Sequence, residues 1–232
     1  MRLLLAAGIL AAALPTPAIA QSARVQAEIN DLTQRVQRLE GTRAILKLQR
    51  AFGYYVDRGL WKQAADLFAD DGTIEIGIDG VYQGRQRIEE YLRRLHGGQE
   101  GLIYGQLNEW VTLQPSIAVA EDGRSGTGRW RDVGMLGQYK QHAEWRDGVY
   151  ENTYEKGADG IWRIKALHLY VNFVAPYEKG WARLRGDEGL ARSQASLDFP
   201  PDRPPSAAYA PFPAVQIPPF QQPNPVTGRA VR

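Results

Sequence analysis

Side chains able to do acid–base chemistry gather between residues 52 and 61. Tyr54 and Asp57 are three residues apart, and Asp57 and Trp61 are four apart, so on a helix they share one side. A buried carboxylate has a raised pKa and suits proton abstraction near neutral pH. Asp57 is therefore the first candidate for a catalytic base. The alternative is that its carboxylate binds backbone N–H groups at the helix break expected at Gly59.

Further candidates lie on predicted strands. His168 shares one side of the strand 162–174 with Tyr170, and an unperturbed histidine pKa of about 6.5 suits an acid or a base. A histidine satisfied within the core is the alternative. Arg129 and Arg131 could stabilise an oxyanion or a phenolate, or they are exposed sheet arginines. Alternation along the strands does not decide which face of the sheet lines a cavity.

The elements that position these residues follow from periodicity. Apolar residues at helical spacing predict helices at about 23–56, 61–68 and 86–95. A strand is expected from Thr73 to Ile78, and β-type alternation then predicts strands at about 107–120, 124–136, 143–156 and 162–174. Glycine-containing turns are expected at 121–123, 146–148 and 157–160. This order indicates the α+β class with an antiparallel meander.

The first helix carries a heptad seam near its start, formed by Val25, Ile29, Leu32, Val36 and Leu39. The seam spans roughly two to three heptads, which is short for a coiled coil. Two interpretations stay open: an amphipathic helix that lies on its own domain, or a helix that joins subunits as a dimer or trimer.

Composition restricts the classes of function. The 232 residues carry a net charge of +2 without a run of Lys or Arg, so nucleic acid is not an expected partner. The chain has no cysteine, and its three histidines make no HxH or HExxH pair, so no metal site is predicted. No glycine-rich phosphate loop is present. We therefore expect no cofactor.

The two ends differ from the middle. Residues 1–20 have the charge, the apolar run and the small-x-small site of a signal peptide cleaved after Ala20, which predicts a periplasmic protein without a membrane anchor. From about Leu197 the chain is rich in proline and should be extended. Aromatic residues spaced through this tail predict that it wraps over its own domain or a neighbour; a disordered end is the alternative.

Several stretches resemble the SnoaL-like branch of the NTF2-like superfamily, which includes scytalone dehydratase, bile-acid dehydratase and polyketide cyclase types. They are Tyr55-Val56-Asp57, Trp61, the run from Asp66 to Asp71, and Gly80-Val81-Tyr82-Gln83-Gly84 with the helix after it. The resemblance covers roughly residues 42–181. It implies a cone in which a curved antiparallel sheet packs against about three helices around a pocket, and cofactor-free enzymes are common among its members.

The resemblance also implies roles for residues, and this sequence departs from two of them. An aspartate at the position of Asp57 often acts as a base or orients one. Dehydratases of the family commonly have a tyrosine five residues earlier; that position is Phe52, so Tyr54 or Tyr55 would have to replace it. The usual catalytic histidine lies on the strand after the third helix, where the segment 108–112 has none.

A looser similarity connects the chain with bacterial lyases that remove formaldehyde from lignin-derived diaryl dimers to give stilbenes. The similar segments are Tyr150-Glu151-Asn152, 162–165, 176–181 and 224–228. It implies a cofactor-independent lyase that removes water and formaldehyde from a phenolic diarylpropanediol or phenylcoumaran. Alternatives are a dehydratase, isomerase or hydrolase on another hydrophobic ring compound, and a non-catalytic periplasmic binding module.

On this interpretation the site residues fall into two groups. The catalytic candidates are Asp57, Tyr54, Tyr55, His168 and Arg129. The substrate-binding candidates are Phe52, Trp61, Trp110, Arg131, Asn152 and Tyr170. The expected organisation is a signal peptide (1–20), a helical extension (21–41), a SnoaL/NTF2-like domain (42–182) and a Pro-rich extension (183–232).

Overall fold

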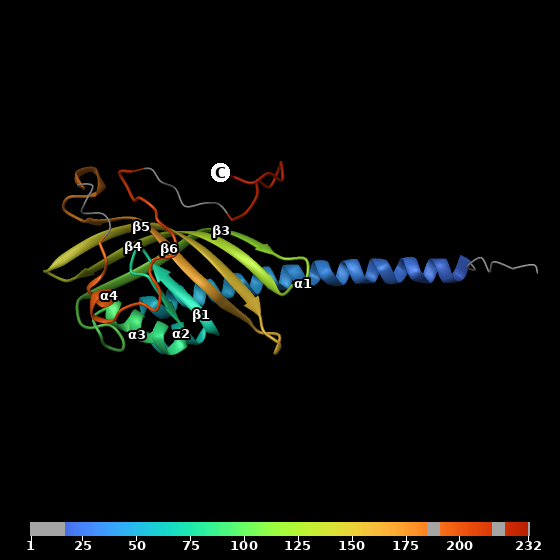
Figure 1. Ribbon diagram of the computed structural model, residues 1–232, viewed down its shortest axis with the longest axis horizontal. Helices are drawn as coiled ribbons and strands as arrows, with labels where there is room; N and C mark the ends of the chain where they lie inside the picture. The colour runs from blue at the N-terminus through green and yellow to red at the C-terminus, as the bar shows by residue number, and fades with distance from the viewer. Residues whose placement is uncertain (1–16, 185–190, 215–220, 232) are drawn as a thin grey trace, which may run out of the picture.

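The computed structural model describes residues 17–184, 191–214 and 221–231, and it shows one curved sheet covered by helices (Figure 1). The helices are α1 (Pro17–Asp57), α2 (Trp61–Asp66), α3 (Arg85–Leu95) and α4 (Gln194–Asp198), with a 3₁₀ turn η1 (Trp181–Arg183). The strands are β1 (Phe68–Ile76), β2 (Val81–Gln83), β3 (Gln106–Val119), β4 (Ser125–Gln138), β5 (His142–Lys156) and β6 (Trp162–Pro176).

The six strands form a single sheet in the order β2-β1-β6-β5-β4-β3. Strands β3 to β6 make the predicted antiparallel meander. The pair β1–β6 is parallel, because the chain leaves β1 through β2, α3 and the whole meander before β6 returns beside it. The sheet is therefore mixed, and the predicted α+β cone is confirmed with this change.

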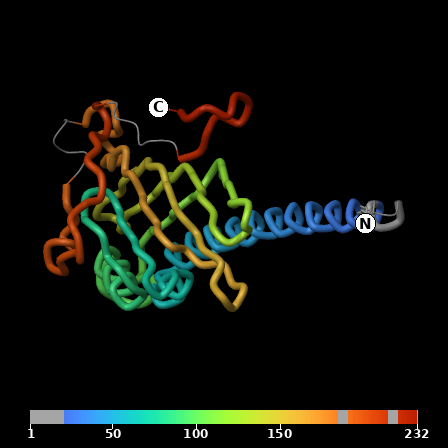
Figure 2. The backbone as a smooth tube through the Cα atoms, turned by 45° about the vertical axis from the view of Figure 1, so that its right-hand side comes forward, coloured from blue at the N-terminus to red at the C-terminus, as the bar shows by residue number. Residues whose placement is uncertain are grey.

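Helices cover the inner face of the sheet, and the core lies between them. Figure 2 shows the second half of α1 passing under the sheet beside α2 and α3. One side of that half, Ile45, Phe52 and Val56, is fully buried. The strands supply the other wall with large inward side chains, among them Trp130, Tyr150, Tyr154, Ile164 and Leu169.

Three predicted boundaries were wrong. Helix α2 ends at Asp66 rather than at Phe68, because Phe68 already pairs with Ile164 as the first residue of β1. The strand β1 therefore runs from Phe68 to Ile76 instead of from Thr73 to Ile78. The turn expected at 146–148 does not exist: these residues lie within β5, and the chain turns at 139–141 instead. Glycine at position 148 allows β5 to pack closely against β6, since a Cβ there would lie 2.8 Å from the Tyr170 carbonyl oxygen.

The first half of α1 extends away from the domain as an isolated helix (Figures 1 and 2). The side chains of residues 21–37 are all exposed. Residues 1–16 of the expected signal peptide lie outside the described residues, and Pro17–Ala20 form the first turn of α1. Within the described part of the chain, no helix is long and apolar enough to cross a membrane.

The described part of the tail wraps over its own domain, as one of the two interpretations predicted. The tail first forms α4, which lies beside α3. It then crosses the edge strand β2, where Arg203 makes an isolated β-bridge with Val81. Beyond that edge it covers the outer face of the sheet, opposite the helices. There the Ser206 backbone N–H donates to Glu75 (2.9 Å), and the Val171 N–H donates to the Tyr209 hydroxyl (3.0 Å).

Candidate active site

A cavity of about 810 Å³ opens at the end of the domain where β1 and α3 finish and the β4–β5 hairpin turns. Its walls mix apolar and polar side chains, including Leu95, His96, Asn108, Trp110, Leu136 and Arg146. This volume is typical of small-molecule sites. The cavity lies on the inner face of the sheet, so this is the sheet face that lines it.

A buried ion pair stands at the wall of this cavity. Arg146 on β5 donates through Nε to Asp132 Oδ2 (2.7 Å) and through Nη2 to Asp132 Oδ1 (3.2 Å). The side chains are 5% and 0% exposed. The guanidinium also lies 3.7 Å from the centre of a Trp110 ring. Gly134 leaves room for it, since a Cβ there would be 3.2 Å from Nε.

His96 follows α3 directly and is held between two indoles. Its ring stacks on Trp61 with centroids 4.9 Å apart and meets Trp110 edge-on at 5.3 Å. Trp61 is fixed by donating from Nε1 to the Gln99 carbonyl (2.5 Å). Burial, with a smaller effect of Arg146, lowers the pKa of His96 to about 3. The imidazole is therefore neutral at physiological pH, and its buried Nε2 has no hydrogen-bond partner among the described residues.

Asp57 lies beside this cavity rather than in its wall, since it is not one of the lining residues. Its Oδ1 accepts the Trp110 backbone N–H at 2.7 Å. Next to it, Asn108 donates to the Val56 carbonyl (2.7 Å) and accepts from Trp110 Nε1 (3.0 Å). These bonds attach the end of α1 to β3. Asp57 thus positions Trp110, while burial raises its pKa to about 6.

This raised pKa makes a prediction for Asp57→Asn. Folding favours the protonated carboxyl, so its stabilising contribution is full below about pH 4 and is lost as the pH rises through about 6. Asparagine does not ionise and still accepts the Trp110 N–H. As the pH rises from 4 to 6, the free energy of unfolding of the variant should therefore increase by about 1 kcal/mol relative to that of the wild type. This value is reduced for solvent screening.

Thermal unfolding of both proteins across this pH range measures the effect. Glu121→Gln, in the exposed turn between β3 and β4, is the control and should show no such trend. A constant difference between Asp57→Asn and wild type would contradict the burial of the carboxyl.

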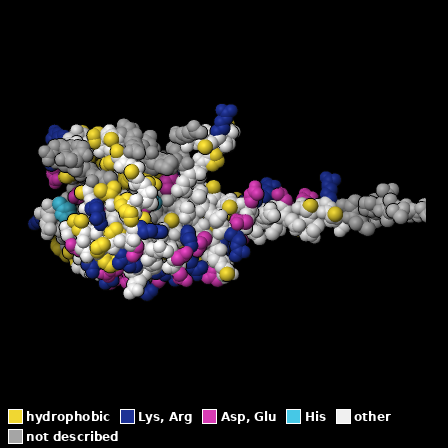
Figure 3. Space-filling view, in the orientation of Figure 1, with side chains coloured by type: hydrophobic (Ala, Val, Ile, Leu, Met, Phe, Trp, Pro, Cys, Tyr) yellow, Lys and Arg dark blue, Asp and Glu magenta, His cyan; other side chains and the backbone are white. Residues whose placement is uncertain are grey.

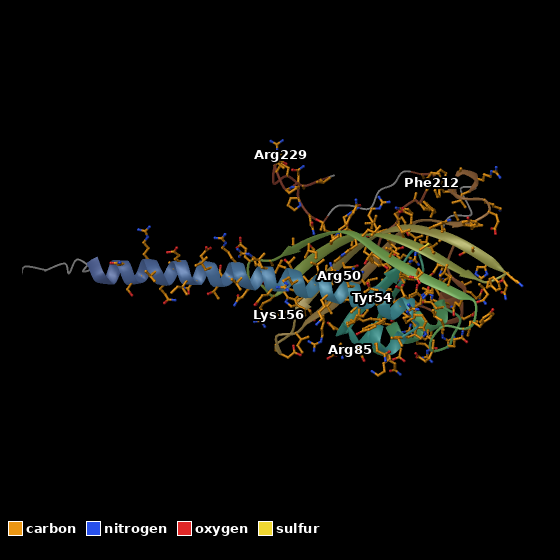
Figure 4. All side chains as sticks on the ribbon, turned by 180° about the vertical axis from the view of Figure 1, so that it is seen from behind. Arg50, Tyr54, Arg85, Lys156, Phe212 and Arg229 are labelled. Atoms are coloured by element: carbon orange, nitrogen blue, oxygen red, sulfur yellow. The ribbon has the colours of Figure 1, made fainter. Side chains whose placement is uncertain are left out.

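The other candidates from the first helical segment are dispersed. Phe52 and Trp61 are fully buried in the core. Tyr55 is partly buried against that core. Tyr54 is 70% exposed and points away from the domain on the outer side of α1, near Arg50 (Figure 4). Of these four, the structure brings only Trp61 to the site, through its stack on His96.

Four of the strand candidates lie on the outer face. Arg129 pairs with Glu151, and Arg131 pairs with Asp147 at 2.7 Å. His168 stacks on Tyr170 with centroids 3.7 Å apart, and its Nδ1 is 3.5 Å from Glu75 Oε2. Burial lowers the pKa of His168 to about 4. The tail packs on the Tyr170 end of this group through Tyr209, whose ring centroid is 5.1 Å from that of Tyr170. Because all four residues lie on the outer face, the thickness of the sheet separates them from the cavity.

Asn152 faces inward but at a distance from the cavity lining. Its amide nitrogen donates to Gln49 Oε1 (3.0 Å) and Tyr154 Oη (3.1 Å), and its oxygen accepts the His168 backbone N–H (3.1 Å). With all these partners, it is a structural residue of the core. Trp110 is the one predicted substrate-binding residue that lines the cavity.

Sequence reasoning missed two residues that line the cavity, His96 and Arg146, and also Asp132, which holds Arg146. His96 directly follows the predicted helix 86–95 and Arg146 begins the predicted turn 146–148, so neither is a site candidate from the sequence. A local signal existed for the pair, because Asp132 and Arg146 both fall at inward positions of neighbouring strands once the turn is placed at 139–141.

Comparisons with known proteins agree with this architecture. Among solved structures, a hexachlorocyclohexane dehydrochlorinase (LinA type 2) shares 18% identity; the match covers 68% of this chain and 97% of that one, with a TM-score of 0.53. The type 3 enzyme of Novosphingobium barchaimii shares 19% identity, with coverage of 68% and 99% and a TM-score of 0.51. These similarities establish the fold alone.

A third structure comes from Novosphingobium aromaticivorans and is provisionally assigned as a scytalone dehydratase. It shares 18% identity over 67% of this chain and 97% of that one, with a TM-score of 0.51. Comparison with curated protein sequences gives no significant match. The family model for the SnoaL-like domain matches residues 37–168, more than half of the chain. The chain therefore belongs to the SnoaL-like domain family.

Proposed function

We propose that this protein is a cofactor-independent lyase that removes water and formaldehyde from phenolic two-ring compounds of the lignin type, giving stilbenes. The observation that carries the proposal is the Arg146 guanidinium, held by Asp132 at the wall of a large cavity with aromatic sides. The similarity of the segments around Tyr150 and Trp162 to such lyases supports the choice of substrate.

The cavity suits a flat, partly anionic ligand. Its volume of about 810 Å³ accommodates two aromatic rings. Trp110 supplies a flat apolar surface, and Arg146 supplies guanidinium N–H donors that Asp132 holds in place. These donors need no reorganisation when negative charge appears beside them. A phenolate oxygen placed at Arg146 would put its ring against Trp110.

The chemistry balances without an oxidant or reductant. The substrate phenol loses its proton, and the benzylic hydroxyl departs with that proton as water, which leaves a quinone methide. His96 then accepts the proton of the terminal CH₂OH group. The carbon–carbon bond to that group breaks, formaldehyde leaves, and the electron pair restores the aromatic ring as a phenolate. His96 returns the proton to the phenolate, so Arg146 stabilises the anionic states and His96 moves the proton.

The properties of His96 agree with this role. Because burial keeps the imidazole neutral, one ring nitrogen can accept a proton at physiological pH. The free protein holds a weak base, since the low pKa opposes protonation. As the carbon–carbon bond breaks, negative charge develops on the ring oxygen at Arg146. This charge would offset the Arg146 charge that contributes to lowering the pKa of His96, so the base would strengthen as the proton is transferred.

The test is incubation of the purified protein with a phenolic 1,2-diarylpropane-1,3-diol. We expect formaldehyde and stilbene in equal amounts, measured by a formaldehyde assay and by stilbene absorbance. The O-methylated diol is the matched control and should be inert, because it cannot form the quinone methide. Loss of water without formaldehyde would overturn the proposal in favour of a dehydratase, and binding without turnover would indicate a binding module.

A further inference from the structure

The projecting half of α1 has an apolar side that nothing in the described structure covers. Val25, Ile29 and Leu32 are each 50% exposed, Val36 is 52% exposed and Leu39 is 67% exposed. In Figure 3 this part of the helix stands clear of the domain, with hydrophobic side chains between charged ones. Most helical stability in proteins comes from packing of an apolar face, so this segment lacks the support that the second half of α1 receives from the sheet.

The exposed seam is not a continuation of the face that packs on the sheet. Successive residues of a helix are rotated by about 100°. On that rotation, Ile29 and Val36 point almost opposite to Ile45, Phe52 and Val56, which are buried against the sheet. The domain of the same chain therefore lies on the wrong side of the helix to cover the seam, and this excludes the first of the two interpretations for residues 21–39.

The residue types of the seam match one kind of partner. Ile29 and Val36 take heptad position a, and Val25, Leu32 and Leu39 take position d. β-Branched residues at a with leucine at d favour two parallel strands in register. The structure also has a shallow hollow on this side, lined by Ile29, Leu32, Thr33, Val36, Gln37 and Glu40.

Four of these residues, Ile29, Leu32, Thr33 and Val36, occupy positions a, d, e and the next a. Four residues of this kind form the hole that receives a d-position side chain from the facing helix. Leu32 of a second copy would therefore fill the hollow. The hole exists in the single chain, so the helix needs no rearrangement to accept it.

The flanking charges are complementary in the same arrangement. Arg35 takes position g, and Glu40 takes the e position five residues later, so each Arg35 would meet Glu40 of the other copy. Among the described residues, Arg35 has a single ionic contact that this pairing would replace, an exposed one with Asp31 at 3.7 Å. The next two a positions are Arg43 and Arg50, which are exposed. Two facing arginines repel, so the pairing would end where the domains begin.

From these observations we propose that residues 22–42 of α1 pair with the same segment of a second copy as a short, parallel, two-stranded coiled coil. The proposal does not depend on the catalytic function. The purified protein should have twice the mass of its single chain, which is 25.9 kDa for all 232 residues, by light scattering over a range of protein concentrations.

Leu32→Glu tests the seam directly. It should raise the dimer dissociation constant by about a hundredfold or more, because each copy loses a buried leucine. Gln34→Glu adds the same charge on the opposite side of the helix and should leave the mass unchanged. Circular dichroism and thermal unfolding check that both variants fold, and Leu32→Ala provides a milder second variant.

Two further variants test the orientation. Arg35→Glu and Glu40→Arg should each weaken the dimer, and the double exchange should restore it, as required by a parallel g–e pairing. Since the natural chain has no cysteine, Leu32→Cys should form a disulfide between copies on oxidation, while Gln34→Cys should not. A monomer, a trimer, or a dimer that Leu32→Glu does not affect would overturn the proposal.

Discussion

Arg146→Met should lower the free energy of unfolding by about 3–5 kcal/mol, because it leaves a fully buried carboxylate without its cation. The Asp132 side chain has 0% exposure, and both of its carboxylate oxygens accept hydrogen bonds from Arg146. The Tyr150 hydroxyl, which also bonds to Asp132, cannot replace a positive charge. Methionine fills much of the arginine volume, so loss of packing contributes little. Urea unfolding near neutral pH measures the change.

Arg131→Met is the matched control on the same sheet. Its ion pair with Asp147 has a similar length, 2.7 Å, but the arginine side chain is 51% exposed. Its removal should cost less than about 1 kcal/mol. The double variant Asp132→Leu with Arg146→Met removes both charges and should recover at least half of the loss. Equal costs for Arg146→Met and Arg131→Met would show that water already screens the buried pair.

The strands and the third helix could be predicted because their patterns are local. Strands β3 to β6 alternate large apolar residues with polar ones, and α3 places Ile88, Tyr91 and Leu92 on one buried side. The parallel pairing of β1 with β6 could not be obtained in this way. It joins segments about ninety residues apart, and it depends on the path of the whole meander.

The site was harder to predict, because tertiary packing rather than residue type selects it. His168 was placed correctly in a strand, yet the choice between the two sheet faces needs the positions of the helices and of the tail. Arg146 was not identified as an inward strand residue, because the sequence Asp147-Gly148 after it is typical of a turn. In the structure the glycine is required by close packing instead. His96 gains its role only when α3 brings it between Trp61 and Trp110.

His96→Asn should lower kcat on the diarylpropanediol by about a hundredfold or more, because a positioned proton-transfer group contributes 10²–10⁴-fold. Asparagine remains polar and of similar length but cannot take up a proton. Thermal unfolding of the variant separates this effect from the loss of the stack on Trp61. The comparison is His168→Asn on the outer face: loss of turnover there, with activity kept in His96→Asn, would place the chemistry under the tail.

The pH profile distinguishes His96 from Asp57 as the proton acceptor. With a pKa of about 3 in the free protein, His96 is neutral across the usable range, so kcat/KM should show no acid limb from this residue between pH 5 and 7. Asp57, with a pKa of about 6, would produce a limb in which activity falls as the pH drops through 6. If such a limb is present in the wild type and absent from a still active Asp57→Asn variant, the carboxyl controls the reaction and the role assigned to His96 is wrong.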